Sequence, residues 1–281
     1  MAEYAHPEAL VDTAWLAEHA KDPNVRVFEV DVDTSAYEQG HVDGAIGINW
    51  RKDLQQSPMR DLLDKRQVED LLSKWGATAE TTIAIYGDNN NWFAAWFFWL
   101  LKYYGHKDAR LVNGGRAKWI AESRPLTTAT STFAKSDYRA KSPDASVRAL
   151  RDLVLERVTD GRAKLIDVRS PKEYAGELLA PENLPQEGAQ RGGHIPGAQN
   201  VPWATAVAED GRFKPADELR SIYEAKGLSK GSETIAYCRI GERSAHTWFV
   251  LRYLLGHDRV RNYDGSWTEW GSLIGVPIEK S

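Results

Sequence analysis

Hydrophobic and polar positions alternate along this chain between short β-branched runs and longer amphipathic segments. Such alternation is typical of βα units, in which a mainly parallel sheet is covered by helices on both faces. In the second half, the pattern predicts strands at 163–168, 199–201, 233–237 and 259–262, and helices near 149–158, 215–226, 243–255 and 266–271. We therefore expect an α/β fold.

The second half of the sequence repeats the first. Asn-Gly-Gly-Arg-Ala-Lys-Trp at 113–119 corresponds to Asp-Gly-Ser-Trp-Thr-Glu-Trp at 264–270, at an offset of 151 residues. A period of this length indicates a duplicated domain. Between the repeats, residues 122–146 are rich in Ser, Thr, Ala and Pro and predict an extended linker. The expected domains are thus 1–121 and 147–281.

Composition excludes several classes of function. With 281 residues, 42% hydrophobic content and a net charge of −4, the chain has no basic footprint for nucleic acid. Its longest apolar run, Trp92 to Leu101, is about half of a membrane span. With one cysteine and no visible secretory signal, we expect a cytoplasmic protein. No motif for metal or cofactor binding stands out, so we expect neither.

Cys238, the only cysteine, is the strongest candidate for chemistry. It lies between a predicted strand and a predicted helix, where loop N–H groups and the helix dipole favour the thiolate. Arg239 and Arg243 add two positive charges to the loop Cys238–Arg243. The sequence therefore predicts a lowered thiol pKa and a binding site for an anion. The alternative is a buried cysteine with a structural role.

The first half serves as an internal control for this loop. At the same offset, Gly87 replaces Cys238 and Trp92 replaces Arg243. We expect residues 1–121 to form a catalytically inactive domain.

The sequence singles out no histidine as a base for the Cys238 thiol. His41 and His194 lie in equivalent Gly-His-x-x-Gly-Ala turns, and His106 and His257 in equivalent Gly-His turns. Residues kept in the inactive half are expected to be structural. His246 occurs only in the second half and stays open as a supporting residue.

A thiolate that needs no base suits phosphoryl transfer or sulfur transfer. Cysteine phosphatases place an arginine six positions after the cysteine, whereas here that position is Ser244 and the arginine is Arg243. In sulfur transfer, the thiolate attacks the outer sulfur of thiosulfate and expels sulfite. Sulfite leaves without protonation, and the loop N–H groups would hold the anionic persulfide. Sulfur transfer is the better fit.

The run Tyr-Cys-Arg-Ile-Gly-Glu-Arg-Ser at 237–244, the Gly-His-Ile-Pro-Gly-Ala turn at 193–198 and the tandem arrangement resemble the rhodanese family, more narrowly its two-domain thiosulfate sulfurtransferases. The resemblance implies two αβα domains, the first inactive, with Cys238 carrying the persulfide. It also implies a six-residue active-site loop that includes Ile240, Gly241 and Glu242.

In this family, the charge of the active-site loop differs between enzymes that use different sulfur donors. Thiosulfate sulfurtransferases tend to carry cations in the loop, whereas mercaptopyruvate enzymes tend to carry small uncharged residues. Arg239 and Arg243 therefore favour the thiosulfate dianion, with cyanide, a thiol or a sulfur-acceptor protein as acceptor. Two alternatives remain: 3-mercaptopyruvate sulfurtransferase, and a non-catalytic module that binds an anion or persulfide and relays sulfur.

Three further features have two interpretations each. Arg169 is expected to bind substrate at the end of its strand, or else to pair with Asp167 or Glu173. Glu242 either holds Arg243 in place or faces solvent. The insertion 176–192 either limits which acceptors reach the cysteine or is inert surface.

Overall fold

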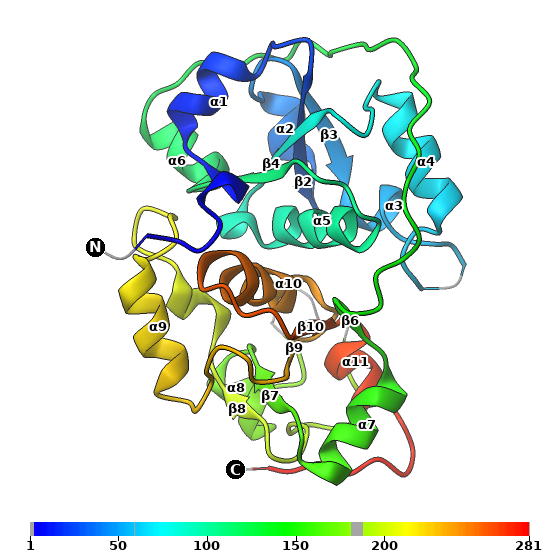
Figure 1. The fold of residues 1–281 in the computed structure, drawn as a ribbon, viewed down its shortest axis with the longest axis vertical. Helices are drawn as coiled ribbons and strands as arrows, with labels where there is room; N and C mark the ends of the chain where they lie inside the picture. The colour runs from blue at the N-terminus through cyan, green and yellow to red at the C-terminus, as the bar shows by residue number, and fades with distance from the viewer. Residues whose placement is uncertain (1–2, 59, 181–187, 281) are drawn as a thin grey trace. The chain divides into compact units, whose positions relative to one another are not determined.

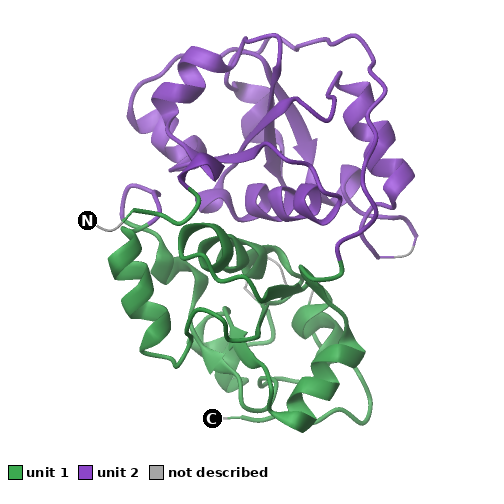
Figure 2. Ribbon diagram, in the orientation of Figure 1, with its two compact units in different colours: residues 1–6, 145–208, 214–281 green, residues 7–144, 209–213 purple. Residues whose placement is uncertain are grey.

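The computed structural model describes residues 3–58, 60–180 and 188–280, which form two compact units (Figures 1 and 2). The N-terminal unit consists of residues 7–144 and 209–213. The C-terminal unit consists of residues 1–6, 145–208 and 214–281.

The N-terminal unit is built on a five-stranded sheet with the order β1-β5-β4-β2-β3, in which neighbouring strands are parallel. Its strands are β1 Leu10–Val11, β2 Val25–Asp31, β3 Ala45–Asn49, β4 Thr82–Tyr86 and β5 Ala109–Val112. Its helices are α1 Thr13–His19, α2 Ser35–Gln39, α3 Trp50–Asp53, α4 Lys65–Lys74, α5 Trp92–Tyr103 and α6 Gly115–Ala121.

Helices cover both faces of this sheet. Val27 in β2 belongs to a buried cluster with Leu16 of α1 and Trp119 of α6. On the opposite face, the ring of Phe28 lies 5.4 Å from that of Phe97 in α5. Successive residues of a strand point to opposite faces, so burial of both requires a helix layer on each side.

The C-terminal unit repeats this plan with the parallel order β6-β10-β9-β7-β8. Its strands are β6 Arg148–Ala149, β7 Lys164–Asp167, β8 Gln199–Asn200, β9 Thr234–Tyr237 and β10 Val260–Tyr263. Its helices are α7 Arg151–Asp160, α8 Pro171–Ala175, α9 Ala216–Glu224, α10 Glu242–Phe249, which continues as a π-helix over Val250–Leu254, and α11 Ser266–Trp270.

The predicted α/β class with helices on both faces is confirmed. All four strands predicted in the second half are present. Three features differ from prediction. Arg148–Ala149 pairs with β10 as an edge strand, so the helix predicted from 149 begins at Arg151. Helix α8 was not predicted, and α10 begins at Glu242, one residue before the predicted start at 243.

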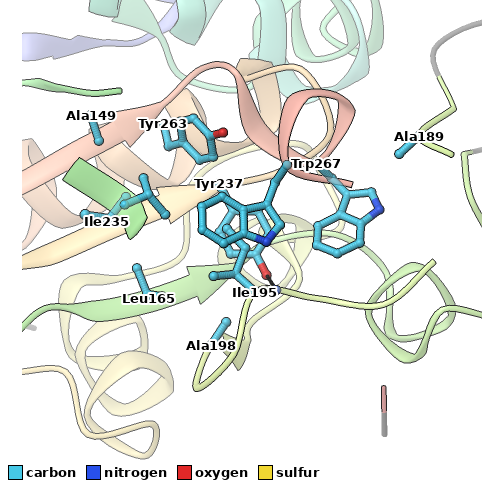
Figure 3. Close-up of a cluster of buried hydrophobic side chains, with 11 residues drawn as sticks. Ala149, Leu165, Ala189, Ile195, Ala198, Ile235, Tyr237, Tyr263 and Trp267 are labelled. Atoms are coloured by element: carbon cyan, nitrogen blue, oxygen red, sulfur yellow. Dashed lines mark hydrogen bonds between the residues drawn. The ribbon is translucent and has the colours of Figure 1, made fainter. Parts of the chain in front are cut away.

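Figure 3 shows the core on one face of the second sheet. Val154 of α7 and the indoles of Trp267 and Trp270 in α11 pack there against Ile235 and Tyr237 of β9. Helix α10 packs against β9 and β10 but contributes no residue to this cluster. We therefore assign α10 to the layer on the opposite face of the sheet.

The duplication extends to individual hydrogen bonds. Tyr86 Oη accepts the N–H of Val42 at 3.1 Å, and Tyr237 Oη accepts the N–H of Ile195 at 3.0 Å. These tyrosines occupy the last position of β4 and of β9. The same contact therefore fixes the end of the central strand in both units.

The two Gly-His turns are equivalent as well. His41 Nδ1 lies 2.9 Å from Tyr37 O, and His194 Nδ1 lies 2.9 Å from Tyr174 O. Each imidazole also stacks on the ring of the same tyrosine. These contacts agree with a structural role for the two histidines, which stays a prediction.

Residues 122–146 contain no helix, and their backbone binds the N-terminal unit. Thr127 exchanges two backbone hydrogen bonds with His41, and Lys141 N donates to Tyr104 O. The role of this segment as a linker stays a prediction. Across the described part of the chain, no helix has the length and apolar content needed to cross a membrane, and no three His, Cys, Asp or Glu side chains gather as a metal site.

Replacing Trp267 by alanine tests the core of the C-terminal unit. The indole is fully buried, and its loss leaves a cavity, so we expect the free energy of unfolding to fall by about 3–5 kcal/mol. Urea unfolding followed by circular dichroism measures this loss. Ile274, which is 99% exposed, provides the control: Ile274→Ala should change stability by less than about 0.5 kcal/mol. Equal effects would contradict the assigned core.

Candidate active site

Cys238 follows β9 directly and has 0% exposed surface. Its Sγ accepts the N–H of Gly241 at 3.1 Å and lies 3.6 Å from the hydroxyl of Ser244. The thiol itself donates to Glu242 Oε2 at 3.2 Å. The sulfur is thus held from three sides by residues of its own loop and of the first turn of α10.

The loop is anchored on the segment around β10. Cys238 N donates to Ser266 Oγ at 3.1 Å, and Cys238 O accepts the N–H of Trp267 at 3.1 Å. Asn262 in β10 donates from Nδ2 to Gly241 O at 3.0 Å. Because each contact fixes the loop backbone, the sulfur has one defined position.

Gly241 makes the sharp turn into α10. Its φ of +96° lies in the left-handed region that favours glycine. A Cβ at this position would also lie only 2.6 Å from Asp264 Cα. Glycine therefore allows the helix to begin at Glu242, which makes Glu242 and Arg243 residues of the first helical turn.

The prediction of a lowered thiol pKa is wrong for this structure. Burial raises the pKa of Cys238 above its ordinary value, and the charge of Glu242 raises it further. The charge of Arg243 acts in the opposite direction without overcoming both. The sequence suggested two cations beside the sulfur, but it did not show that a carboxylate would be in contact with it.

Arg243 is bound by Glu173, which the sequence suggested as a partner of Arg169. Its Nη1 and Nη2 donate to the two oxygens of Glu173, each at 3.0 Å. Burial alone would raise the pKa of Glu173, but the hydrogen bonds and charge of Arg243 outweigh it and lower the pKa to about 2. Arg243 and Glu173 thus form a buried bidentate ion pair.

A sequence signal for Glu173 was available. Ser170 and Glu173 form a reciprocal capping box at the start of α8, in which Glu173 Oε2 accepts the N–H of Ser170. Ser-Pro-Lys-Glu at 170–173 matches the pattern of that motif. The motif would have predicted α8 and a fixed carboxylate, although not its pairing with Arg243.

Glu242 is completely buried, so the interpretation in which it faces solvent is wrong. Its Oε1 lies 3.6 Å from Arg243 Nε and 4.0 Å from Arg239 Nη2. The contact of Oε2 with the thiol was not foreseen. Arg239 and Ile240 complete the buried loop, which brings the predicted residues 238–243 together.

Arg169 is tied to the end of its own strand. Its Nη2 donates to Asp167 Oδ2 at 2.6 Å and to Gly193 O at 2.7 Å. The guanidinium also lies over the indole of Trp267, 4.5 Å from its ring centre. The structure therefore shows the pairing with Asp167 that we considered as the alternative, and substrate binding by Arg169 stays a prediction.

In the equivalent loop of the N-terminal unit, side-chain hydrogen bonds go to backbone groups and not to a thiol. Asn91, which corresponds to Glu242, accepts the N–H of Gly87 at 2.9 Å and donates to Val112 O at 2.7 Å. A Cβ at Gly87 would lie 2.5 Å from Val30 O. This position has no room for a cysteine side chain without movement of β2.

The end of the insertion 176–192 packs on α11. Arg191 N donates to Gly271 O at 3.1 Å, and Trp267 Nε1 donates to Arg191 O at 3.0 Å. Residues 181–187 lie outside the described residues. The role of the insertion in acceptor access stays a prediction.

The raised thiol pKa has a direct consequence for alkylation. We expect the rate of Cys238 modification by iodoacetamide to reach half its maximum above pH 9.0, the ordinary value for the group, because only the thiolate reacts. Mass spectrometry of protein quenched at a series of pH values measures this midpoint. A midpoint at or below the ordinary value would contradict the contact with Glu242.

Glu173→Gln should lower the free energy of unfolding by about 3 kcal/mol, because it removes the bidentate ion pair of the buried Arg243 and leaves only the more distant Glu242 carboxylate as counterion. The pKa of Glu173 is lowered from 4.5 to about 2, so its contribution is complete above pH 4.5 and is lost as pH falls toward 2. The difference in the free energy of unfolding between the wild type and Glu173→Gln should therefore shrink as pH falls from 4.5 toward 2. Urea unfolding at several pH values tests this, with the exposed Glu224→Gln as control.

Comparison with known proteins identifies the family and supports the fold. The Rhodanese-like domain family matches residues 12–122 and 150–273. "Sulfur carrier protein TtuD" of Thermus thermophilus is 54% identical over 99% of this chain and 98% of its own length. "Putative thiosulfate sulfurtransferase" of Mycolicibacterium smegmatis is 52% identical over 98% of this chain and 99% of its own length.

Solved structures share the fold at low sequence identity. An anaerobic ergothioneine biosynthesis enzyme from Chlorobium limicola superposes with a TM-score of 0.86 and 22% identity, covering 100% of this chain and 72% of that chain. YnjE superposes with a TM-score of 0.83 and 22% identity, covering 100% and 70%. With two matched regions and relatives that align over nearly its whole length, this chain belongs to the Rhodanese-like domain family.

Proposed function

We propose that this protein is a thiosulfate sulfurtransferase that carries sulfane sulfur as a persulfide on Cys238. The observation that supports this most is the single thiol at the junction of β9 and α10, with the Gly241 N–H directed at its sulfur. The relatives named as thiosulfate sulfurtransferases and as a sulfur carrier agree with this chemistry.

In the proposed reaction, the thiolate of Cys238 attacks the outer sulfur of thiosulfate. The S–S bond of thiosulfate breaks, and its electron pair leaves with sulfite. A nucleophilic acceptor such as cyanide then removes the outer sulfur and regenerates the thiolate. The Gly241 N–H, already bound to Sγ, stabilises negative charge on the sulfur, as does the guanidinium of Arg243.

We propose thiosulfate as the sulfur donor because the loop contains two positive charges. Thiosulfate has two negative charges and mercaptopyruvate has one carboxylate, and two guanidiniums in the loop suit the dianion better. Glu173 and Glu242 each neutralise part of this positive charge. The enclosed sulfur also requires that side chains around the loop open when the donor enters.

A relay function is the second candidate, because one relative at 54% identity is named a sulfur carrier protein. In that function, the persulfide forms on Cys238 but passes to a thiol of an acceptor protein rather than to cyanide. The first unit has no nucleophile at Gly87, so we propose that it is catalytically inactive in either case.

Cys238→Ser tests the proposed function. Incubation of the wild type with thiosulfate should add one sulfur atom to Cys238, as seen by mass spectrometry, and should support thiocyanate formation from cyanide. The variant should show neither, since a serine hydroxyl is a far weaker nucleophile. We expect kcat/KM to be higher for thiosulfate than for mercaptopyruvate. Sulfur addition without thiocyanate turnover favours the relay, and no addition to the wild type excludes both functions.

A further inference from the structure

The thiol of Cys238 is hydrogen-bonded to a buried carboxylate. It donates to Glu242 Oε2 at 3.2 Å, and both side chains are fully buried. The other oxygen, Oε1, has no hydrogen-bond partner among the residues that the structure describes. A proton thus lies between the reacting sulfur and a carboxylate that is only partly satisfied.

The charges around this pair nearly cancel. Arg243 Nε and Arg239 Nη2 lie 3.6 and 4.0 Å from Glu242 Oε1, and Arg243 is also bound by Glu173 of α8. Beyond the loop, Asp264 after β10 is paired with Arg148. The ion pairs of the described residues thus join two loop guanidiniums to two carboxylates. Arg169, whose charge also reaches Glu173, is paired with Asp167.

A protonated thiol is a poor nucleophile, so the reaction needs a destination for its proton. Burial and Glu242 both raise the pKa of Cys238, so bulk solvent is an unfavourable destination near neutral pH. The Oε2 atom of Glu242 is already in hydrogen-bonding contact with the thiol. No other residue has to move for this transfer.

We propose that Glu242 is a catalytic residue that accepts the proton of Cys238 when thiosulfate binds. This inference rests on the proposed function. Thiosulfate brings two negative charges next to the carboxylate, which favours its neutral form. The same proton transfer removes the repulsion between Glu242 and the donor and produces the thiolate that attacks it.

The step balances in atoms and electrons. The S–H bond breaks, its proton goes to Oε2, and its electron pair stays on Sγ. That pair forms the new S–S bond with the outer sulfur, while the electron pair of the old S–S bond leaves with sulfite. The product is a persulfide anion beside a neutral carboxylic acid.

The second half of the cycle returns the proton. When cyanide takes the outer sulfur as thiocyanate, Sγ becomes a thiolate and recovers the proton from Glu242. Thiosulfate and cyanide thus become sulfite and thiocyanate with no net uptake or release of protons. In between, the protonated carboxyl donates a hydrogen bond to the persulfide anion, which is the charge-assisted interaction that stabilises it.

The Glu242→Gln variant tests whether Glu242 acts as a proton acceptor or only as a fixed negative charge. Glutamine keeps the size and removes both the charge and the basic oxygen. Two rates are measured from pH 5.5 to 8.5: alkylation by iodoacetamide, and persulfide formation in a single turnover with thiosulfate and no acceptor. Glu242→Asp, which keeps a carboxylate on a shorter side chain, is the matched control.

We expect the two rates to change in opposite directions. Alkylation of Glu242→Gln should be faster than that of the wild type, because the thiol ionises more readily without the neighbouring charge. Persulfide formation should be at least about tenfold slower at pH 6 and should rise about tenfold per pH unit, while the wild-type rate stays nearly flat. Glu242→Asp should keep the flat profile at a reduced rate.

Each other outcome has one meaning. If Glu242→Gln forms the persulfide as fast as or faster than the wild type, Glu242 is only a charge and the inference fails. If the wild type forms no persulfide, the proposed function itself fails. Should Glu242→Gln not fold, a wild-type rate of persulfide formation that rises tenfold per pH unit overturns the proposal, and a flat wild-type profile retained by Glu242→Asp supports it.

Discussion

The passage of the chain from β9 into α10 is the constraint on which the site depends. The turn occupies residues 238–241, and it closes because Gly241 adopts a left-handed φ of +96° against the backbone of Asp264. This turn directs the Gly241 N–H at Sγ and makes Glu242 the first residue of the helix. A different residue at 241 would move the N–H and the carboxylate together, because one backbone conformation places both.

The electrostatics of the site follow from pairing rather than from the number of cations. Arg243 donates two hydrogen bonds to Glu173, and Glu242 lies within 4.0 Å of both loop arginines. Inside a protein, a guanidinium without a counterion is costly, so these carboxylates stabilise the folded loop. The contact with Glu242 adds to burial in raising the pKa of the Cys238 thiol.

Duplication has preserved the scaffold and changed the loop. The tyrosine at the end of β4 or β9 accepts the same backbone N–H in both units, and the stacked Tyr-His pair is repeated. A guanidinium persists as well, but from another element: Arg116 of α6 binds Glu29, whereas Arg169 after β7 binds Asp167. At Gly87, the backbone oxygen of Val30 lies where a cysteine side chain like that of Cys238 would begin.

The sequence by itself determined the α/β class, the duplication, the predicted strands of the second half and the loop around Cys238, because hydrophobic period, repeated motifs and residue type are local properties. It did not determine the ionisation of the thiol or the partners of Arg243 and Glu242. Those depend on which charged groups of separate elements meet, and on burial that raises the energy of any unpaired charge. Only the tertiary structure brings Glu173 of α8 to Arg243 of α10. It is also the tertiary structure that places the buried carboxylate of Glu242 in contact with the sulfur of Cys238.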